Sequence, residues 1–441
     1  MPLRQESSMA GSADRISSLP DTLLHHVMSF LQAQEAVGLC VLAQRWRHLW
    51  KDMCVLRVTG GRPVHEWHKF LDHVISLRGH YHLNACLFHF STFSGGDWPY
   101  VNQWIQYALS CQVRVLDVSF RSGRSFPLPE LPLFSQTLTQ LKLHYLRLNQ
   151  KFLDFSSCPA LEDLTMTKCS IPAKKISSCS IKRLSILKCC FTRDTRTRIS
   201  IPSLVSLQLI AVDGRTPLIE DMPVLITAAV RLDDNCRDSH YYLSPAACGD
   251  LSCECCNATD WRICDDFACE CCYGDEDRSG TCVILEGFSA ATTLKMIVDP
   301  GVFILRRDLR WCPTFIKLKT LILNEGCVAA DHNALICILQ HSPVLENLTV
   351  QLSQKHTHMA TTIRRATYNL LEQSFVSENL KIVEIACQNV DQRVNNIMKS
   401  LSTYGIPLEK IKICQTNKSS ECFNFVCTGF SSKQWREDQD Q

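Results

Sequence analysis

The sequence predicts an α/β protein in which three short N-terminal helices precede an irregular array of stacked strands. Segments of the form L-x-x-L-x-L recur between residues 113 and 413, whereas residues 14–51 place apolar side chains at helical spacing. At 441 residues, 46% of them hydrophobic, the chain can bury a sizeable core. We therefore expect a small helical unit followed by a curved solenoid with a parallel sheet on its concave face.

Residues 14–51 carry the features of three short helices. In the first, apolar side chains recur at three- and four-residue steps after Pro20, which can start a helix. A second helix is expected to carry Val37, Val41 and Leu42. A third, from Gln44 to Trp50, places its two tryptophans on one face. So many large apolar groups cannot all be buried within so short a segment, which indicates a partner.

The stretches LPDTLL, SFL, QEAV and RWRHLW resemble the F-box of plant F-box proteins. Family members often have Ser at the position of Ala43 and a small polar pair at Leu39 and Cys40, but neither departure adds charge. The resemblance implies that residues 14–54 dock on the SKP-type adaptor of an SCF ubiquitin ligase and through it on a cullin. A helical domain that merely buries these side chains in its own core is the alternative. The residues expected to carry docking are Leu19, Pro20, Leu23, Leu24, Val27, Phe30, Leu31, Val41, Trp46 and Trp50.

Composition limits the other kinds of partner. A formal net charge of +2 gives no electrostatic reason to bind nucleic acid or an anionic membrane. No run approaches the roughly 20 apolar residues of a membrane span, and the N-terminus has no apolar signal region. We expect a soluble, intracellular protein, cytoplasmic and/or nuclear, whose 26 cysteines are thiols or metal ligands. Residues 1–13 and 431–441 are polar and expected to be disordered.

The repeated segments run from Val113/Leu116/Val118 to Leu408/Ile411/Ile413. Most successive units begin 20 to 35 residues apart, close to the roughly 20–29-residue period of leucine-rich repeats. Each unit supplies one short strand whose leucines need a neighbour to be buried, so the units should stack. Helices at residues 65–77 and 100–111, within a linker and cap at 55–111, should close the start, and a helix at 391–404 the end. An ordinary α/β domain of alternating strands and helices is the alternative.

The C-terminal stretches SENLKIVEIA and YGIPLEKIKI resemble the FBD-type region of plant F-box leucine-rich-repeat proteins. We assign residues 112–375 to the repeats and residues 376–430 to FBD-like C-terminal repeats and a cap. Polar residues between the leucines should face the concave surface and are expected to bind an unknown target protein. These residues are Gln140, Lys142, His144, Asp163, Thr165, Thr167, Arg183, Ser206 and Gln208.

One step, from Leu225 to Ala291, spans 66 residues and contains a cysteine-rich insertion, residues 235–282. Its two CECC sequences recur sixteen residues apart, and paired thiolates are broadly what a tetrahedral zinc site uses. Against zinc stand the unusual spacing, the lack of a clear histidine, and acidic neighbours that raise thiol pKa values. A flexible, redox-sensitive loop is the alternative, and no cofactor is otherwise expected. The candidate zinc ligands are Cys253, Cys256, Cys269 and Cys272.

No sequence motif assembles an active site. The chain has no P-loop, no G-x-S-x-G and no H-E-x-x-H, and its 15 histidines are scattered. We expect no catalytic residues and interpret the chain as the substrate-recognition subunit of an SCF-type cullin-RING ubiquitin ligase, which acts by proximity. The alternatives are a non-ligase scaffold built from an F-box and repeats, or a metal-binding regulatory protein that uses the CECC pairs.

Overall fold

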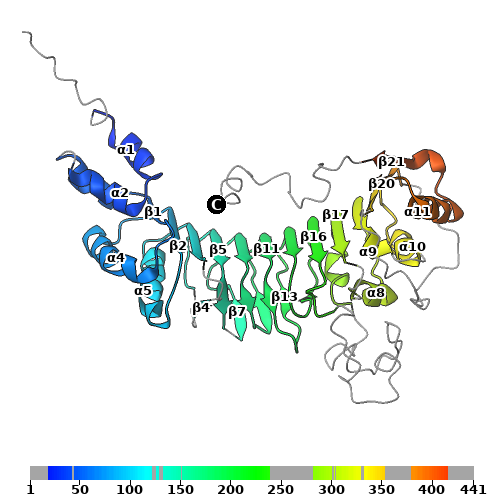
Figure 1. The fold of residues 1–441 in the computed structure, drawn as a ribbon, viewed down its shortest axis with the longest axis horizontal. Helices are drawn as coiled ribbons and strands as arrows, with labels where there is room; N and C mark the ends of the chain where they lie inside the picture. Colours follow the sequence, from blue (N-terminus) through cyan, green and yellow to red (C-terminus); the bar gives the residue numbers. More distant parts are fainter. Residues whose placement is uncertain are drawn as a thin grey trace, which may run out of the picture.

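The computed structural model describes residues 18–41, 44–121, 126–128, 133–149, 151–238, 282–299, 302, 304–328, 332–352 and 379–415. Its main feature is a row of parallel strands that forms a shallow arc, with helices at both ends (Figure 1). The segments expected to be disordered, 1–13 and 431–441, lie outside the described residues.

The main sheet has thirteen strands, and their order across the sheet is their order along the chain. Every neighbouring pair is parallel. The strands are β1 (Val55–Val58), β2 (Ala85–Phe90), β3 (Val115–Phe120), β5 (Gln140–His144), β8 (Asp163–Thr167), β11 (Arg183–Leu187), β14 (Ser206–Ile210), β16 (Thr227–Leu232), β17 (Thr293–Val298), β18 (Thr320–Asn324), β19 (Asn347–Gln351), β20 (Ile382–Cys387) and β21 (Ile411–Gln415).

Every L-x-x-L-x-L segment forms one of these strands, as predicted. The middle apolar residue of each segment pairs with its counterpart in the next, so that Leu141 lies opposite Leu164 and Leu164 opposite Leu184. These side chains are buried and form a continuous apolar layer behind the sheet. Strands β1 and β2 were not predicted, because residues 55–111 were interpreted as a linker and cap helices only.

The middle of the chain makes three strands per turn, not the single strand that was predicted. Two further parallel four-stranded sheets run beside the main sheet. Short strands therefore occupy the positions where connecting helices could lie, and this part of the molecule carries no helix among its described residues (Figure 1). One sheet contains β4 (Phe126–Leu128), β6 (Leu146–Leu148), β9 (Ser170–Ile171) and β12 (Cys190–Phe191), and the other β7 (Phe152–Asp154), β10 (Lys175–Ser177), β13 (Arg198–Ser200) and β15 (Leu218–Ile219).

A left-handed residue turns the chain at the end of four consecutive main-sheet strands. Tyr145, Lys168, Lys188 and Ala211 have φ between 53° and 59°. The N–H of each donates to a carbonyl of the next turn, as from Lys168 to Leu187 at 2.8 Å. Backbone hydrogen bonds therefore hold the bend, although residues other than Gly disfavour this left-handed conformation.

Helices close both ends of the row (Figure 1). At the N-terminal end, α4 (Val64–Arg78) and α5 (Trp98–Ser110, preceded by η3, Gly95–Asp97) match the predicted cap helices. At the other end, α11 (Gln392–Thr403) begins where the Asp391 side chain accepts from the backbone of Arg393 and Val394, and Gly405 at φ 86° follows it. The remaining elements of this end are η6 (Glu286–Phe288), α8 (Ile304–Asp308), η7 (Leu309–Trp311), α9 (Glu325–Val328), α10 (Asn333–Gln340) and η8 (Leu408–Lys410).

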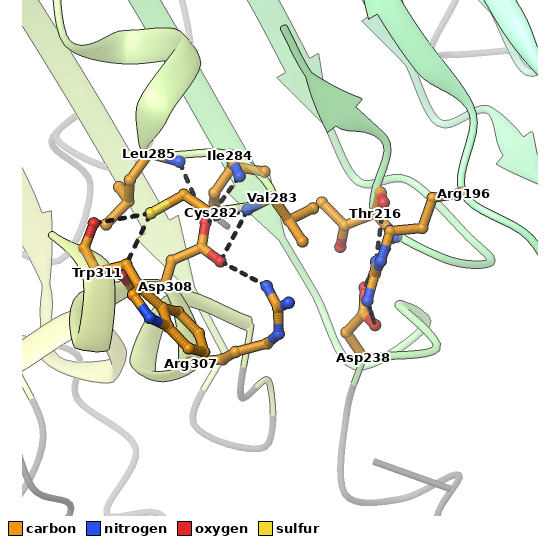
Figure 2. Close-up of polar contacts among 10 residues, drawn as sticks. All are labelled: Arg196, Thr216, Asp238, Cys282, Val283, Ile284, Leu285, Arg307, Asp308 and Trp311. Carbon is orange, nitrogen blue, oxygen red and sulfur yellow. Dashed lines mark hydrogen bonds and ion pairs between the residues drawn. The ribbon is translucent and has the colours of Figure 1, made fainter. Parts of the chain in front are cut away.

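The stems of the cysteine-rich insertion belong to the core, so its predicted limits of 235 and 282 were too wide. Cys236 and Asp238 are buried before the insertion, and Cys282 is buried after it. Asp238 binds Arg196, and Cys282 donates to main-chain carbonyls near Asp308 (Figure 2). The four candidate zinc ligands, Cys253, Cys256, Cys269 and Cys272, lie outside the described residues.

Candidate docking and recognition surfaces

The N-terminal unit, residues 18–54, contains α1 (Asp21–Met28), α2 (Ala33–Gly38), η1 (Leu39–Val41), α3 (Trp46–Leu49) and η2 (Trp50–Asp52). The first helix is shorter than predicted and ends before Phe30 and Leu31. It stops where the Ser29 hydroxyl donates to the carbonyl of His26 at 2.6 Å, a local bond that competes with further helix. The second helix continues only as a 3-10 turn to Val41, and Leu42 lies outside the described residues.

Helix α1 has one buried face and one apolar exposed face. Leu24 and Met28 are fully buried in the protein's own core. Leu23 and Val27 are 50% and 48% exposed, and Phe30, just beyond the helix, is 66% exposed. Exposure of aliphatic and aromatic groups of this size to water is unfavourable in free energy. Another protein that covered this face would remove that cost.

The ten residues predicted to dock on an adaptor separate into three groups by exposure. Leu24, Trp46 and Trp50 are buried, so they support the surface from beneath. Leu19 and Leu31 are partly buried against the same core. The exposed members are Pro20, Leu23, Val27, Phe30 and Val41.

The N-terminal unit is attached to the first strand by polar contacts. The side-chain oxygen of Gln32 accepts from the backbone N–H of Thr59 at 3.0 Å, and Arg57 donates to the carbonyl of Ser29 at 2.7 Å. Gln32 also begins α2, where its backbone N–H donates to Glu35 at 2.9 Å. These bonds connect the end of α1 and the start of α2 to β1.

An open groove of about 840 Å³ lies between the N-terminal unit and α4. Val41, 82% exposed, and Leu77, 55% exposed, supply apolar groups to it. Leu77 was not predicted as a site residue, because it lies off the buried Val64/Trp67/Leu71 stripe of α4 and only the fold brings it beside the N-terminal unit. The groove is lined by Val37, Cys40, Val41, Gln44, Arg47, His48, Trp50, Lys51 and Leu77.

The nine predicted target-binding residues lie on one face of the main sheet. Along β5, β8, β11 and β14 they alternate with buried apolar residues, so they point away from the core. The register aligns them in rows across the sheet, and all are partly exposed. The first row is Gln140, Asp163, Arg183 and Ser206, the second contains Lys142, Thr165 and Gln208, and the third contains His144 and Thr167.

Charges on this face are paired across strands. Arg183 makes a bidentate contact with Asp163, the residue opposite it in the register, with Nη2 2.7 Å from Oδ2. Beside it, Lys182 donates to Glu162 at 2.6 Å. The planar guanidinium and carboxylate therefore present a fixed pattern of charge to a partner.

Two histidines flank a carboxylate at the N-terminal end of the same face. His89 Nε2 lies 3.1 Å and His144 Nε2 3.6 Å from Asp117 Oδ1. Burial alone would raise the pKa of Asp117, but the contact with His89 and the surrounding positive charge lower it. Burial lowers the pKa of His144, with Asp117 opposing, which favours the neutral ring.

The described cysteines are mostly structural. Cys169 and Cys189 are buried directly after two left-handed corner residues, and their thiols donate to the carbonyls of Leu143 and Met166 at 3.3 Å. In these positions the two cysteines act as small buried apolar groups. One group within the described ranges has a metal-ligating arrangement, Cys312 with Cys337 and His341.

No helix within the described ranges is both long and apolar enough to cross a membrane.

Comparison with known proteins identifies the N-terminal unit. Residues 16–57 match the F-box domain family. A rice (Oryza sativa subsp. japonica) MEIOTIC F-BOX protein is 28% identical over 365 residues, 76% of this chain and 70% of that protein. An Arabidopsis thaliana F-box/LRR-repeat protein is 33% identical over 40% of this chain and 56% of its own length.

A third relative extends the similarity to the C-terminal region. An F-box/FBD/LRR-repeat protein of Arabidopsis thaliana is 25% identical over 439 residues, 91% of this chain and 92% of that protein. An F-box domain indicates binding to an SKP-type adaptor, and the exposed apolar face of α1 lies inside the matched segment. The chain therefore contains an F-box domain and is similar over most of its length to plant F-box/LRR-repeat and F-box/FBD/LRR-repeat proteins.

Proposed function

We propose that the chain is a substrate receptor of an SCF-type ubiquitin ligase. The observation that carries this proposal is the apolar face of Leu23, Val27 and Phe30, which is exposed in the segment that matches the F-box. The SKP-type adaptor would cover this face, and the adaptor would connect the chain to a cullin. The contribution of the chain to ubiquitin transfer is then to hold a target close, without catalytic residues of its own.

The parallel main sheet is proposed to be an irregular leucine-rich-repeat solenoid whose polar face binds the target. Its strands follow one another without a change of order, which supports a repeat array over a doubly wound α/β domain. The face is hydrogen-bonded and charged, so a polar protein surface suits it better than an apolar small molecule.

Two adjacent leucines provide the sharpest test. Leu23 is 50% exposed and Leu24 is fully buried, although both lie on α1. Leu23→Asp should abolish binding to a coexpressed SKP-type adaptor, a loss of about 2–4 kcal/mol, and leave the thermal midpoint of the chain unchanged. Leu24→Asp places a charge in the core and should lower that midpoint as well.

The measurement is adaptor pull-down combined with thermal unfolding of each variant. Phe30→Asp serves as a second surface variant, because Phe30 is exposed beyond the end of α1. Adaptor binding that survives both Leu23→Asp and Phe30→Asp would overturn the docking assignment. Adaptor binding without copurification of a cullin would instead indicate a scaffold outside a ligase.

A further inference from the structure

Three potential metal ligands converge at the C-terminal end of the molecule, away from the N-terminal unit. Cys312 directly follows η7, while Cys337 lies on α10 and His341 directly follows that helix, four residues later. One donor atom from each lies within 4.8 Å of the other two. Cys337 is buried and the other two are partly exposed, so an ion could enter from solvent.

We propose that Cys312, Cys337 and His341 bind a zinc ion. Zinc prefers tetrahedral sites with Zn–S of about 2.3 Å and Zn–N of about 2.0–2.1 Å, which places ligand atoms about 3.5–3.8 Å apart. The observed atoms lie within 4.8 Å of one another, so they need to approach by about 1.3 Å at most to reach these separations. Two thiolates and an imidazole leave a fourth position for water or for a side chain of another protein.

The contacts around the group favour ligation. His341 Nδ1 lies 2.8 Å from the carbonyl oxygen of Cys337 and 4.0 Å from the Cys337 sulfur, so the ring is held beside the thiol. In the tautomer whose Nδ1 donates to this carbonyl, Nε2 carries the lone pair that would bind the ion. Zinc binds cysteine as thiolate, so its binding would release the protons of both thiols.

A fourth cysteine nearby does not share these properties. The thiol of Cys282 donates to the carbonyl of Trp311 at 3.0 Å and to that of Asp308 at 3.4 Å (Figure 2). The main chain thus engages this thiol as a hydrogen-bond donor, and its sulfur is not one of the three converging ligand atoms. Cys282 is thus a matched control cysteine that should not bind the ion.

Cobalt(II) substitution in the full-length chain, purified with its adaptor under reducing conditions, tests the site. Tetrahedral cobalt gives intense visible bands, and each thiolate adds sulfur-to-cobalt charge transfer. Wild type should show both, and zinc should displace the cobalt. Cys312→Ser and His341→Gln should each remove about one equivalent of bound metal, whereas Cys282→Ser should bind as wild type does.

The difference in bound metal between wild type and each variant reports only on Cys312, Cys337 and His341. Metal held by the cysteine-rich insertion is common to all the proteins and cancels in this difference. Circular dichroism of each variant checks that it is folded, and His341→Gln, at a partly exposed position, is the variant least disturbing to the core. Equal metal content in wild type, Cys312→Ser and His341→Gln would overturn the proposal. So would wild type that shows no thiolate-to-cobalt band, or loss of metal in Cys282→Ser alone.

Discussion

Arg196 and Asp238 form a buried, bidentate ion pair, with both guanidinium nitrogens 2.8 Å from a carboxylate oxygen (Figure 2). Their side chains are 2% and 5% exposed. Asp238 also accepts from the backbone N–H of Thr216 at 2.9 Å. It is the last described residue before the insertion, so this pair attaches one stem of the insertion to the repeats.

The first prediction concerns the pH dependence of stability at this pair. Burial works to raise the pKa of Asp238, but Arg196 outweighs it and lowers the pKa to about 2. An unfolded Asp titrates near pH 3.9, so the ionised pair stabilises the fold above about pH 4 and this stabilisation is lost as pH falls to about 2. Asp238→Asn should lower the free energy of unfolding by about 2–3 kcal/mol at pH 7.

Urea unfolding of wild type and Asp238→Asn between pH 2 and pH 7 measures this effect. The two curves should converge at the acidic end, where Asp238 is protonated and resembles Asn. A difference that stays constant over the whole range would show that the pair contributes by packing and not by charge.

The second prediction concerns the limits of the insertion. On the far stem, the Asp308 carboxylate accepts from the backbone N–H groups of Val283, Ile284 and Leu285 at 2.7–3.1 Å. Replacing residues 239–281 by a short Gly/Ser linker keeps both anchors and should leave the thermal midpoint close to that of wild type. Replacing residues 235–282 removes Cys236, Asp238 and Cys282 from the core and should lower it by several degrees. Equal midpoints for the two deletions would contradict the assignment of the stems to the core.

The position of the strands was predictable from sequence because each L-x-x-L-x-L segment alternates buried and exposed positions, and alternation is a local property. Strands β1 and β2 also alternate in burial, but they lie between segments with a helical pattern and were therefore not predicted. The three-strand turns were missed, since pieces as short as Ser170–Ile171 carry no recognisable period.

Site residues were harder to predict than strands, because their role depends on contacts between distant segments. The apolar pattern of α1 does not distinguish Leu23 from Leu24, and the core of the N-terminal unit decides which is buried. Asp238 and Arg196 are 42 residues apart, and nothing in the local sequence of either residue indicates that the fold pairs them. Cys312 and His341 were likewise separate in sequence and meet only where η7 packs on α10.

The third prediction concerns the left-handed corners. Ala211 has φ 53° after β14, whereas Ala228 lies within β16 and is 2% exposed. Ala211→Gly relieves a conformation that costs roughly 1–2 kcal/mol and should change the free energy of unfolding by less than about 1 kcal/mol, because Gly also loses more entropy on folding. Ala228→Gly relieves nothing and should destabilise by more than the corner variant, since it removes a buried methyl group within a strand. Chemical denaturation of the two variants measures the difference, and a greater loss at Ala211 would show that its Cβ is needed for packing.

The last prediction concerns target recognition by the paired charges of the main sheet. Arg183 and Asp163 contact each other, so a single reversal would break the pair and confound local stability with binding. The double variant Asp163→Arg, Arg183→Asp retains an ion pair but exchanges its ends. Because a pair this exposed contributes only about 0–1 kcal/mol to stability, the double variant should remain folded and still bind the adaptor. It should nevertheless lose target proteins that wild type captures after proteasome inhibition, since the charge pattern facing them is reversed.

Lys175→Glu, on strand β10 of a separate sheet, is the matched control and should retain these target proteins. Quantitative affinity purification with mass spectrometry compares the three proteins, and capture by the double variant equal to that by wild type would place the recognition surface away from β8 and β11.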